Sequence, residues 1–285
     1  MESASGHASD GTLNAGIPAA HGWTLKSPAP DEIQRDRLGD EQAAFYLVTS
    51  ASFIESGSQL YGQNLLAYFA EDAELSAWLQ ERWEPEERHH GQALRAYVEG
   101  AWPDFPWEAA FAEFMTEYSR SCTLEMLQST PVLELAARCM VETGTSCYYR
   151  ALRDAFSEPA LVQLMDHIAG DEVGHYRQFY RFFRSHAQSE GFSRLAVART
   201  LLSRLIENRT MDTDCAIRHV YQTGFRIAGC ERLSPAQLRP LLQRTLRPHF
   251  PFRLAVEMLI RPLTLPTRLR KASTGFLVHM APLFL

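Results

Sequence analysis

The stretch Glu87-Arg88-His89-His90, together with a second copy of its pattern at Glu172-Val173-Gly174-His175, decides the fold of this chain. In each stretch a glutamate and a histidine stand three residues apart, so on a helix both side chains leave the same face, one turn apart. One such pair arises easily by chance on a polar helix. Two copies, each inside a long helical pattern, indicate a site that uses carboxylate and imidazole groups together, and these suit iron or manganese.

Two further glutamates stand at matching positions in the neighbouring helices. Apolar residues recur at helical spacing over residues 40–70, 73–99, 131–156 and 161–185, with breaks at Glu71-Asp72 and Ser157-Glu158-Pro159. Glu55 lies 17 residues before Asp72 (72 minus 55), and Glu87 lies 15 after it (87 minus 72). Antiparallel hairpins therefore bring the two glutamates to similar heights.

The second hairpin repeats this arrangement. Glu142 lies 16 residues before Glu158 (158 minus 142), and Glu172 lies 14 after it (172 minus 158). A bundle with one glutamate on each of two helices and Glu-x-x-His on the other two is the ligand set of di-iron and di-manganese proteins. The predicted metal ligands are Glu55, Glu87, His90, Glu142, Glu172 and His175, whose four carboxylates would balance two divalent ions.

An acid stands directly before each glutamate of the two motifs, Glu86 in the first and Asp171 in the second. A histidine that binds a metal usually donates its other N–H to a carboxylate. We therefore expect Asp171 to contact His90 and Glu86 to contact His175, with ordinary surface acidity as the alternative. His89 and His167 are expected to point away from the ligand face.

Three segments resemble soluble acyl-carrier-protein desaturases, within the ferritin-like di-iron superfamily. Trp83–Gly91 is similar to their W-x-x-E-E-x-x-H-G segment, Ile168–His175 to their I-A-x-D-E-x-x-H segment, and Glu142–Thr145 to their E-x-x-T. The resemblance covers roughly residues 40–185. Departures are a Glu55-to-Glu87 spacing shorter than expected for a plant desaturase and a C-terminal hundred residues without counterpart.

The resemblance implies a non-haem di-iron oxidoreductase that uses O2 to oxidise a C–H bond of an aliphatic substrate, by desaturation or hydroxylation. The cofactor would be two iron ions, with a manganese–iron pair as the alternative. Thr145 would act as a catalytic proton relay, or else as an ordinary helix threonine bonded to a carbonyl. Superfamily members also pass electrons through a tryptophan before the first helix, so Trp23 is either an electron path through Asp171 or a packing anchor.

Two other functions stay open, a di-iron N-oxygenase and a ferritin-like iron-handling or peroxidase protein. N-oxygenases of the arylamine type carry a third histidine where this chain has Ile168, and rubrerythrins usually carry a CxxC module that is absent here. The expected partners are an external electron donor, either ferredoxin-like or a flavin reductase, a second copy of the chain, and an acyl carrier protein as the substrate's carrier. We expect no nucleic-acid partner.

The fold is expected to be all-α: a flexible tail over residues 1–35, a ferritin-like four-helix bundle over 36–188, and a basic helical C-terminal extension over 189–285. The five cysteines are scattered without a CxxC pair and the N-terminus lacks a signal pattern, which favours the cytoplasm. No apolar run of about 18 residues predicts a membrane span.

Charge is distributed unevenly along the chain. Within a net charge of −6, residues 1–185 carry −15 (13 basic, 28 acidic) and residues 186–285 carry +9 (15 basic, 6 acidic). The two parts are expected to pack on each other or on a sister subunit, or else the basic part docks an acidic partner. The extension itself is expected to cover the substrate channel or form a subunit contact, with a membrane surface as a further option.

Overall fold

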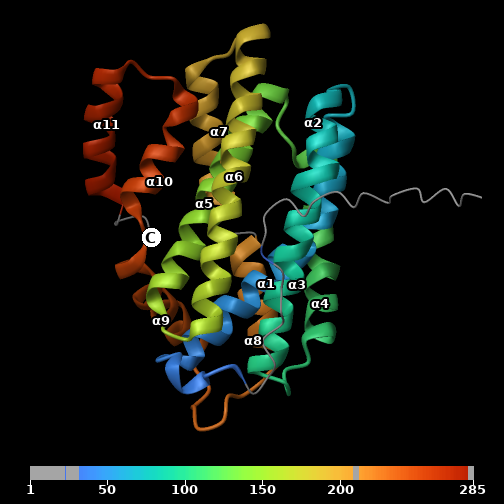
Figure 1. Ribbon diagram of the computed structural model, residues 1–285, viewed down its shortest axis with the longest axis vertical. Coiled ribbons are helices and arrows are strands. Elements are labelled where there is room, and N and C mark those ends of the chain that lie inside the picture. Colours follow the sequence, from blue (N-terminus) through green and yellow to red (C-terminus); the bar gives the residue numbers. More distant parts are fainter. Residues whose placement is uncertain (1–22, 24–31, 208–211, 282–285) are drawn as a thin grey trace, which may run out of the picture.

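All regular structure in the described residues is helical (Figure 1). A computed structural model describes Trp23 and residues 32–207 and 212–281. Most of the predicted tail over residues 1–35 lies outside this described part. The all-α prediction is confirmed. No helix among the described residues is both long and apolar enough to cross a membrane.

The first hairpin consists of α1 (Glu41–Tyr68) and α3 (Glu84–Ala101), joined by the short α2 (Ala73–Trp78). Asp40 caps α1, since its carboxylate accepts a hydrogen bond from the Ala43 N–H at 3.0 Å. Asp72 caps α2 in the same way through Leu75 N–H, also at 3.0 Å. These two caps lie where the acid-rich breaks in the sequence predicted helix starts.

One feature of this hairpin was not predicted. Residues 73–99 were expected to form one regular helix, but Leu79–Trp83 forms a π-helical turn in which Glu84 N–H bonds to the Leu79 carbonyl. Pro85 offers a physical reason. It has no N–H to give to the carbonyl four residues earlier, and its ring crowds that carbonyl, so a regular α-helical ladder is interrupted here.

The second hairpin consists of α5 (Pro131–Ala155) and α6 (Pro159–Ser189). Glu158 caps α6 from a fully buried position, accepting hydrogen bonds from Leu161 N–H at 2.7 Å and from the Tyr97 hydroxyl at 3.0 Å. This second bond ties the turn of the second hairpin to α3. The helix begins two residues earlier and ends four residues later than predicted (161–185).

The two hairpins are the most extensive helix pairs in the described chain, and α3 and α6 also contact each other (Figure 1). Aromatic side chains fill the core on either side of the ligand level: Phe45, Tyr97 and Trp102 in one cluster, Phe179 and Phe183 in the other. Four helices thus run past one another with their glutamates between two apolar layers.

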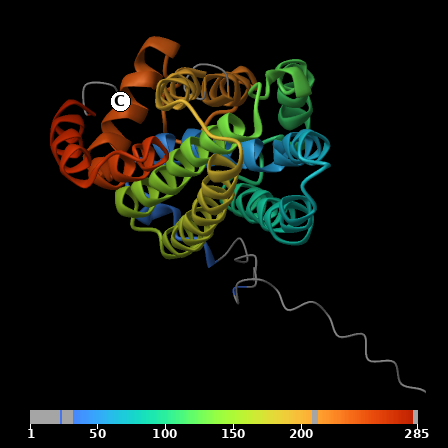
Figure 2. The ribbon, with the colours of Figure 1, turned by 90° about the horizontal axis from the view of Figure 1, so that it is seen from above.

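The remaining helices surround this assembly. They are α4 (Trp107–Ser121), α7 (Arg194–Glu207), α8 (Thr213–Gln222), α9 (Pro235–Leu246), α10 (Phe252–Leu259) and α11 (Thr267–Met280). Residues 189–285 were predicted to be helical, and α7 to α11 lie within this range. Figure 2 shows these C-terminal helices along one side, where α7 and α10 pack on α5, and α8 packs on α1 and α4.

Candidate metal centre

Six buried side chains converge between the two hairpins. Glu55 comes from α1, Glu87 and His90 from α3, Glu142 from α5, and Glu172 and His175 from α6, and each is at most 7 % exposed. They form two groups, one of Glu55, Glu87, His90 and Glu172, the other of Glu87, Glu142, Glu172 and His175. Within each group the ligand atoms lie within 4.8 Å of one another. Glu87 and Glu172 belong to both groups, so the two groups lie side by side and share two carboxylates.

The two histidines face the carboxylates with the same ring nitrogen. Nδ1 of His90 lies 3.3 Å from Glu172 Oε1 and 4.0 Å from Glu55 Oε2. Nδ1 of His175 lies 3.1 Å from Glu87 Oε1 and 3.7 Å from Glu142 Oε2. The second hairpin thus mirrors the first, as its matching residue counts predicted.

The opposite ring nitrogens face outward to the two acids singled out in the sequence. Nε2 of His90 lies 3.2 Å from Asp171 Oδ2, and Nε2 of His175 lies 2.8 Å from Glu86 Oε2. Both predicted contacts are therefore present, each crossing from one hairpin to the other. Such carboxylates hold a proton on Nε2, so Nδ1 is the nitrogen that would bind a metal once it has lost its own proton.

Several buried atoms at the centre lack a hydrogen-bond partner. They are His90 Nδ1, His175 Nδ1 and Glu172 Oε1, although carboxylate oxygens are close to both nitrogens. Buried polar atoms are rarely left unpaired, because each costs roughly 1–3 kcal/mol. Atoms that converge without hydrogen bonds fit metal coordination, which would satisfy all three together.

The ionisation of these groups points the same way. Burial raises the pKa of Glu142, and the neighbouring charge of Glu172 adds to this, giving a value of about 8. Burial, with the charges of Glu87 and Glu172, also raises the pKa of Glu55 well above its usual range. The centre thus holds protons where cations would otherwise compensate the carboxylates.

Burial alone lowers the pKa of an imidazole, which is opposite to its effect on a carboxylic acid. Burial alone lowers the pKa of His90, but the hydrogen bond to Asp171 and the contact with Glu172 outweigh it and raise the pKa to about 10. In Glu172, burial raises the pKa, but the contacts with His175 and His90 lower it by more, so the pKa of Glu172 lies well below its usual range. Glu172 is thus the carboxylate that the two imidazoles jointly hold in its charged form.

Thr145 lies at the edge of the centre. Its hydroxyl is 2.7 Å from Glu172 Oε2 and 3.3 Å from the carbonyls of Val141 and Glu142. The hydroxyl therefore contacts both a predicted ligand and its own helix, so both alternatives raised from the sequence have a contact behind them. The ligand contact is the shorter.

The sequence reasoning missed Tyr149. Its buried hydroxyl donates a hydrogen bond to Glu55 Oε1. Tyr149 follows Glu142 by seven residues, which is two helical turns, so the helical repeat places it on the ligand face of α5. That spacing was the available signal.

Trp23 reaches the centre from outside α3 and α6. Its indole N–H donates to Asp171 Oδ2 at 3.0 Å, which is the predicted contact. The indole ring stacks on His167 with centroids 4.9 Å apart, and lies 4.4 Å from the ring of His89. His89 and His167, which were expected to point away from the ligand face, therefore hold Trp23 against Asp171. Asp171 in turn contacts His90.

No family model, curated protein or solved structure matches this chain. The chemical character of the centre is set by its own donors. Four glutamates and two histidines, all buried and within reach of one another, could hold metal ions. Oxygen and imidazole donors together suit first-row transition metals such as iron and manganese.

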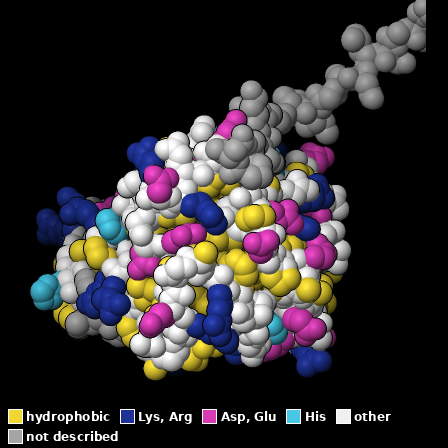
Figure 3. Space-filling view, turned by 90° about the horizontal axis from the view of Figure 1, so that it is seen from below, with side chains coloured by type: hydrophobic (Ala, Val, Ile, Leu, Met, Phe, Trp, Pro, Cys, Tyr) yellow, Lys and Arg dark blue, Asp and Glu magenta, His cyan; other side chains and the backbone are white. Residues whose placement is uncertain are grey.

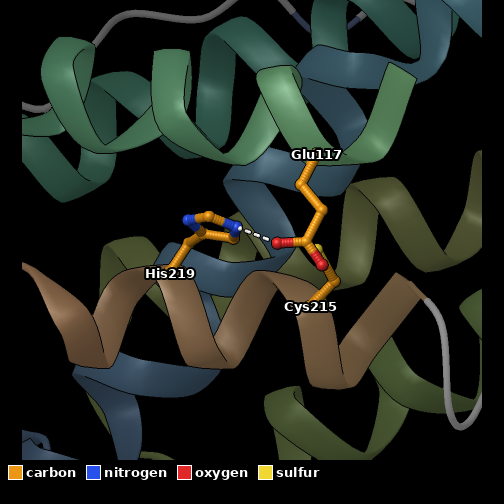
Figure 4. A group of neighbouring side chains, drawn as sticks. All are labelled: Glu117, Cys215 and His219. Carbon is orange, nitrogen blue, oxygen red and sulfur yellow. Dashed lines mark hydrogen bonds and ion pairs between the residues drawn. The ribbon is translucent and has the colours of Figure 1, made fainter. Parts of the chain in front are cut away.

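A third group with metal-ligand side chains lies between α4 and α8, and consists of Glu117, Cys215 and His219 (Figure 4). Here an arginine side chain already compensates the charge of the carboxylate. Both oxygens of Glu117 pair with the Arg218 guanidinium, at 2.5 and 2.9 Å, and one also lies 3.0 Å from His219 Nε2. Arg218 lowers the pKa of Glu117 to about 2, helped by His219. We therefore interpret this group as an ion pair between the acidic and basic parts of the chain.

Proposed function

We propose that this chain is a ferritin-like di-iron oxidoreductase that uses O2 to oxidise a C–H bond of an aliphatic substrate, by desaturation or hydroxylation. One observation carries the proposal. Two overlapping groups of buried ligands share Glu87 and Glu172, and the inward nitrogens of both histidines have no hydrogen bond. This is the ligand set and pairing of di-iron carboxylate proteins, and the desaturase-like motifs lie on the same residues.

When bound, a pair of iron ions would supply the capacity to accept electrons and activate O2. The ligands would be Glu55, His90, Glu142 and His175 at the two ends, with Glu87 and Glu172 between them. Asp171 and Glu86 would hold the imidazole tautomers through the outward nitrogens. The apolar layers above and below would exclude water from the centre.

Two hydroxyl side chains have roles in this scheme. Thr145 donates to Glu172 at 2.7 Å and would hold a proton beside this ligand. Tyr149 donates to Glu55 and would fix the orientation of that carboxylate. Both lie on α5, on the face that carries Glu142.

Electrons would enter from an external donor. The hydrogen-bonded series Trp23, Asp171, His90 joins the outer side of α3 and α6 to the centre, with contacts of 3.0 and 3.2 Å. The donor would be a ferredoxin-like protein or a flavin reductase. An acyl carrier protein as substrate carrier and a homodimer complete the proposal.

An N-oxygenase is the less favoured enzyme, because fully buried Ile168 stands where the arylamine-type enzymes would have a third histidine. An iron-handling protein shares the ligand set, but after oxidation it would store or release the iron and leave organic molecules unchanged. The two are separated by the fate of the iron and of the substrate.

The test is a single-turnover experiment. The protein is loaded anaerobically with ferrous iron, then mixed with O2 in the presence of an acyl-acyl-carrier-protein, a free fatty acid or an arylamine. Consumption of O2 coupled to oxidised aliphatic product supports the proposal. Arylamine oxidation would favour the N-oxygenase, and repeated iron turnover with ferric mineral and no organic product would favour iron handling. A Glu142→Ala variant, which lacks a ligand, is the control for adventitious iron.

A further inference from the structure

The C-terminal helix α11 is the most exposed of the long helices in the described chain. None of its residues is buried, and every residue of Thr267–Ala272 is exposed. Figure 1 shows α11 at the edge of the molecule, packed on α10, which in turn packs on α5. The helix is therefore attached to the body through one neighbour and presents most of its circumference outward.

The exposed side of α11 carries an apolar stripe. Leu269 and Phe276 are seven residues apart and thus share one face, and they are 51 % and 66 % exposed. Met280 lies one helical turn after Phe276 on the same face, and Leu277, next to Phe276 in the sequence, is 36 % exposed. Large apolar side chains gathered on one exposed face mark an interaction site.

Two basic residues, Arg268 and Arg270, flank Leu269 on either side of this stripe, and Lys271 lies on the opposite side of the helix. Arg268, Arg270 and Lys271 lie close together in the first two turns of α11, and all three are exposed. No acidic residue occurs in the sequence after Glu257, so residues 258–285 are purely basic in charge. Figure 3, which views the molecule from below, shows Lys and Arg side chains at its left edge and at several other places on this face.

We propose that α11 docks on an anionic lipid surface, with Phe276 and Leu269 entering the interface, Arg268 and Arg270 contacting lipid phosphates and carboxylates, and Lys271 adding to the positive charge near the surface. A helix with an exposed apolar face flanked by basic side chains lies in the interface of an anionic bilayer, held by apolar burial and by charge. In a two-fold contact between two copies of α11, the basic residues would meet no acidic side chain on the partner helix, because no acid occurs in the sequence after Glu257. The docking is independent of the metal chemistry.

The test is flotation of the full-length protein with phosphatidylcholine vesicles, with and without phosphatidylserine. We expect binding only to vesicles that contain phosphatidylserine, and weaker binding as salt is raised. The triple variant Arg268→Gln, Arg270→Gln, Lys271→Gln should bind about a hundredfold more weakly, since each basic residue near the surface contributes roughly fivefold. Phe276→Ser should lower binding by roughly tenfold or more.

The matched control removes the same charge elsewhere. Arg244 lies on α9, Arg247 directly after it and Arg253 on α10, and all three are exposed. Replacing all three by glutamine should leave vesicle binding within a few-fold of that of the natural chain. Equal loss in the control, or no binding to phosphatidylserine vesicles, would overturn the proposal. So would a dimer that dissociates in Phe276→Ser, or binding of purified acyl carrier protein through α11 without vesicle binding.

Discussion

A close backbone approach in the first hairpin lies directly beside two of the candidate metal ligands. Gly91 follows His90, and it packs on Ser56, which follows Glu55. A Cβ at position 91 would lie 2.9 Å from Ser56 Cα and N. Since ordinary contacts begin at 3.4 Å, α1 and α3 must separate by 0.5 Å (3.4 minus 2.9) in Gly91→Ala for the new contact to become an ordinary one. Neither backbone can rotate away, so the helices themselves must move.

Two effects oppose each other in this variant. Alanine in a helix interior gains about 1 kcal/mol over glycine, whereas overpacking costs about 1–3 kcal/mol. Because the clash is with backbone, we expect the upper part of that cost and a net loss of roughly 1–2 kcal/mol in the free energy of unfolding. Metal binding should weaken as well, since the shift separates Glu55 from His90.

Gly174 is the matched control. It lies between Glu172 and His175, and a Cβ there meets nothing within 4 Å. Gly174→Ala should therefore keep metal binding and raise the free energy of unfolding by up to about 1 kcal/mol. Urea unfolding of the metal-free proteins, followed by circular dichroism, measures both variants. Gly91→Ala as stable as Gly174→Ala would refute the packing argument.

Three further predictions concern the centre. Asp171→Asn removes the charge behind His90 and should weaken metal binding about ten- to a hundredfold in chelator competition, whereas Asp166→Asn, at an exposed ion pair on the same helix, should not. Thr145→Ala should retain metal but change the rate of O2 consumption in stopped-flow measurements; an unchanged rate would assign Thr145 to its backbone contacts. At pH 7 the metal-free protein holds protons on His90 and Glu142, whose pKa values are raised to about 10 and about 8. Metal binding should therefore release protons and tighten as pH rises towards those values, which calorimetry in buffers of different ionisation enthalpy detects as a buffer-dependent heat.

The positions of the ligands were accessible from the sequence because helical geometry is regular. Counting residues from Asp72 and Glu158 predicted that Glu55 meets Glu87 and that Glu142 meets Glu172, and the structure brings all of these together. The outward contacts of His90 and His175 were also predictable, since an acid next to each Glu-x-x-His motif occupies the right helical position.

Other features were missed, some of them because they depend on tertiary contacts. The π-helical turn at Leu79–Trp83 does have a local signal in Pro85, but the apolar residues continue at helical spacing across it, so one regular helix was predicted. Helix α8 was not singled out within the helical extension, although its buried residues Cys215, Ala216, His219 and Val220 recur at helical spacing; it is only ten residues long, and it packs on α1 and α4. The rings that hold Trp23 come from α3 and α6, so its surroundings are determined by the fold.

The central claim is that the six residues bind two metal ions. The most direct measurement is the metal content of the protein after anaerobic loading with ferrous iron and removal of free metal. Two ions per chain, with at most one retained in Glu142→Ala, is the result expected here. One ion or none per natural chain, or the same content in Glu142→Ala, would contradict the claim.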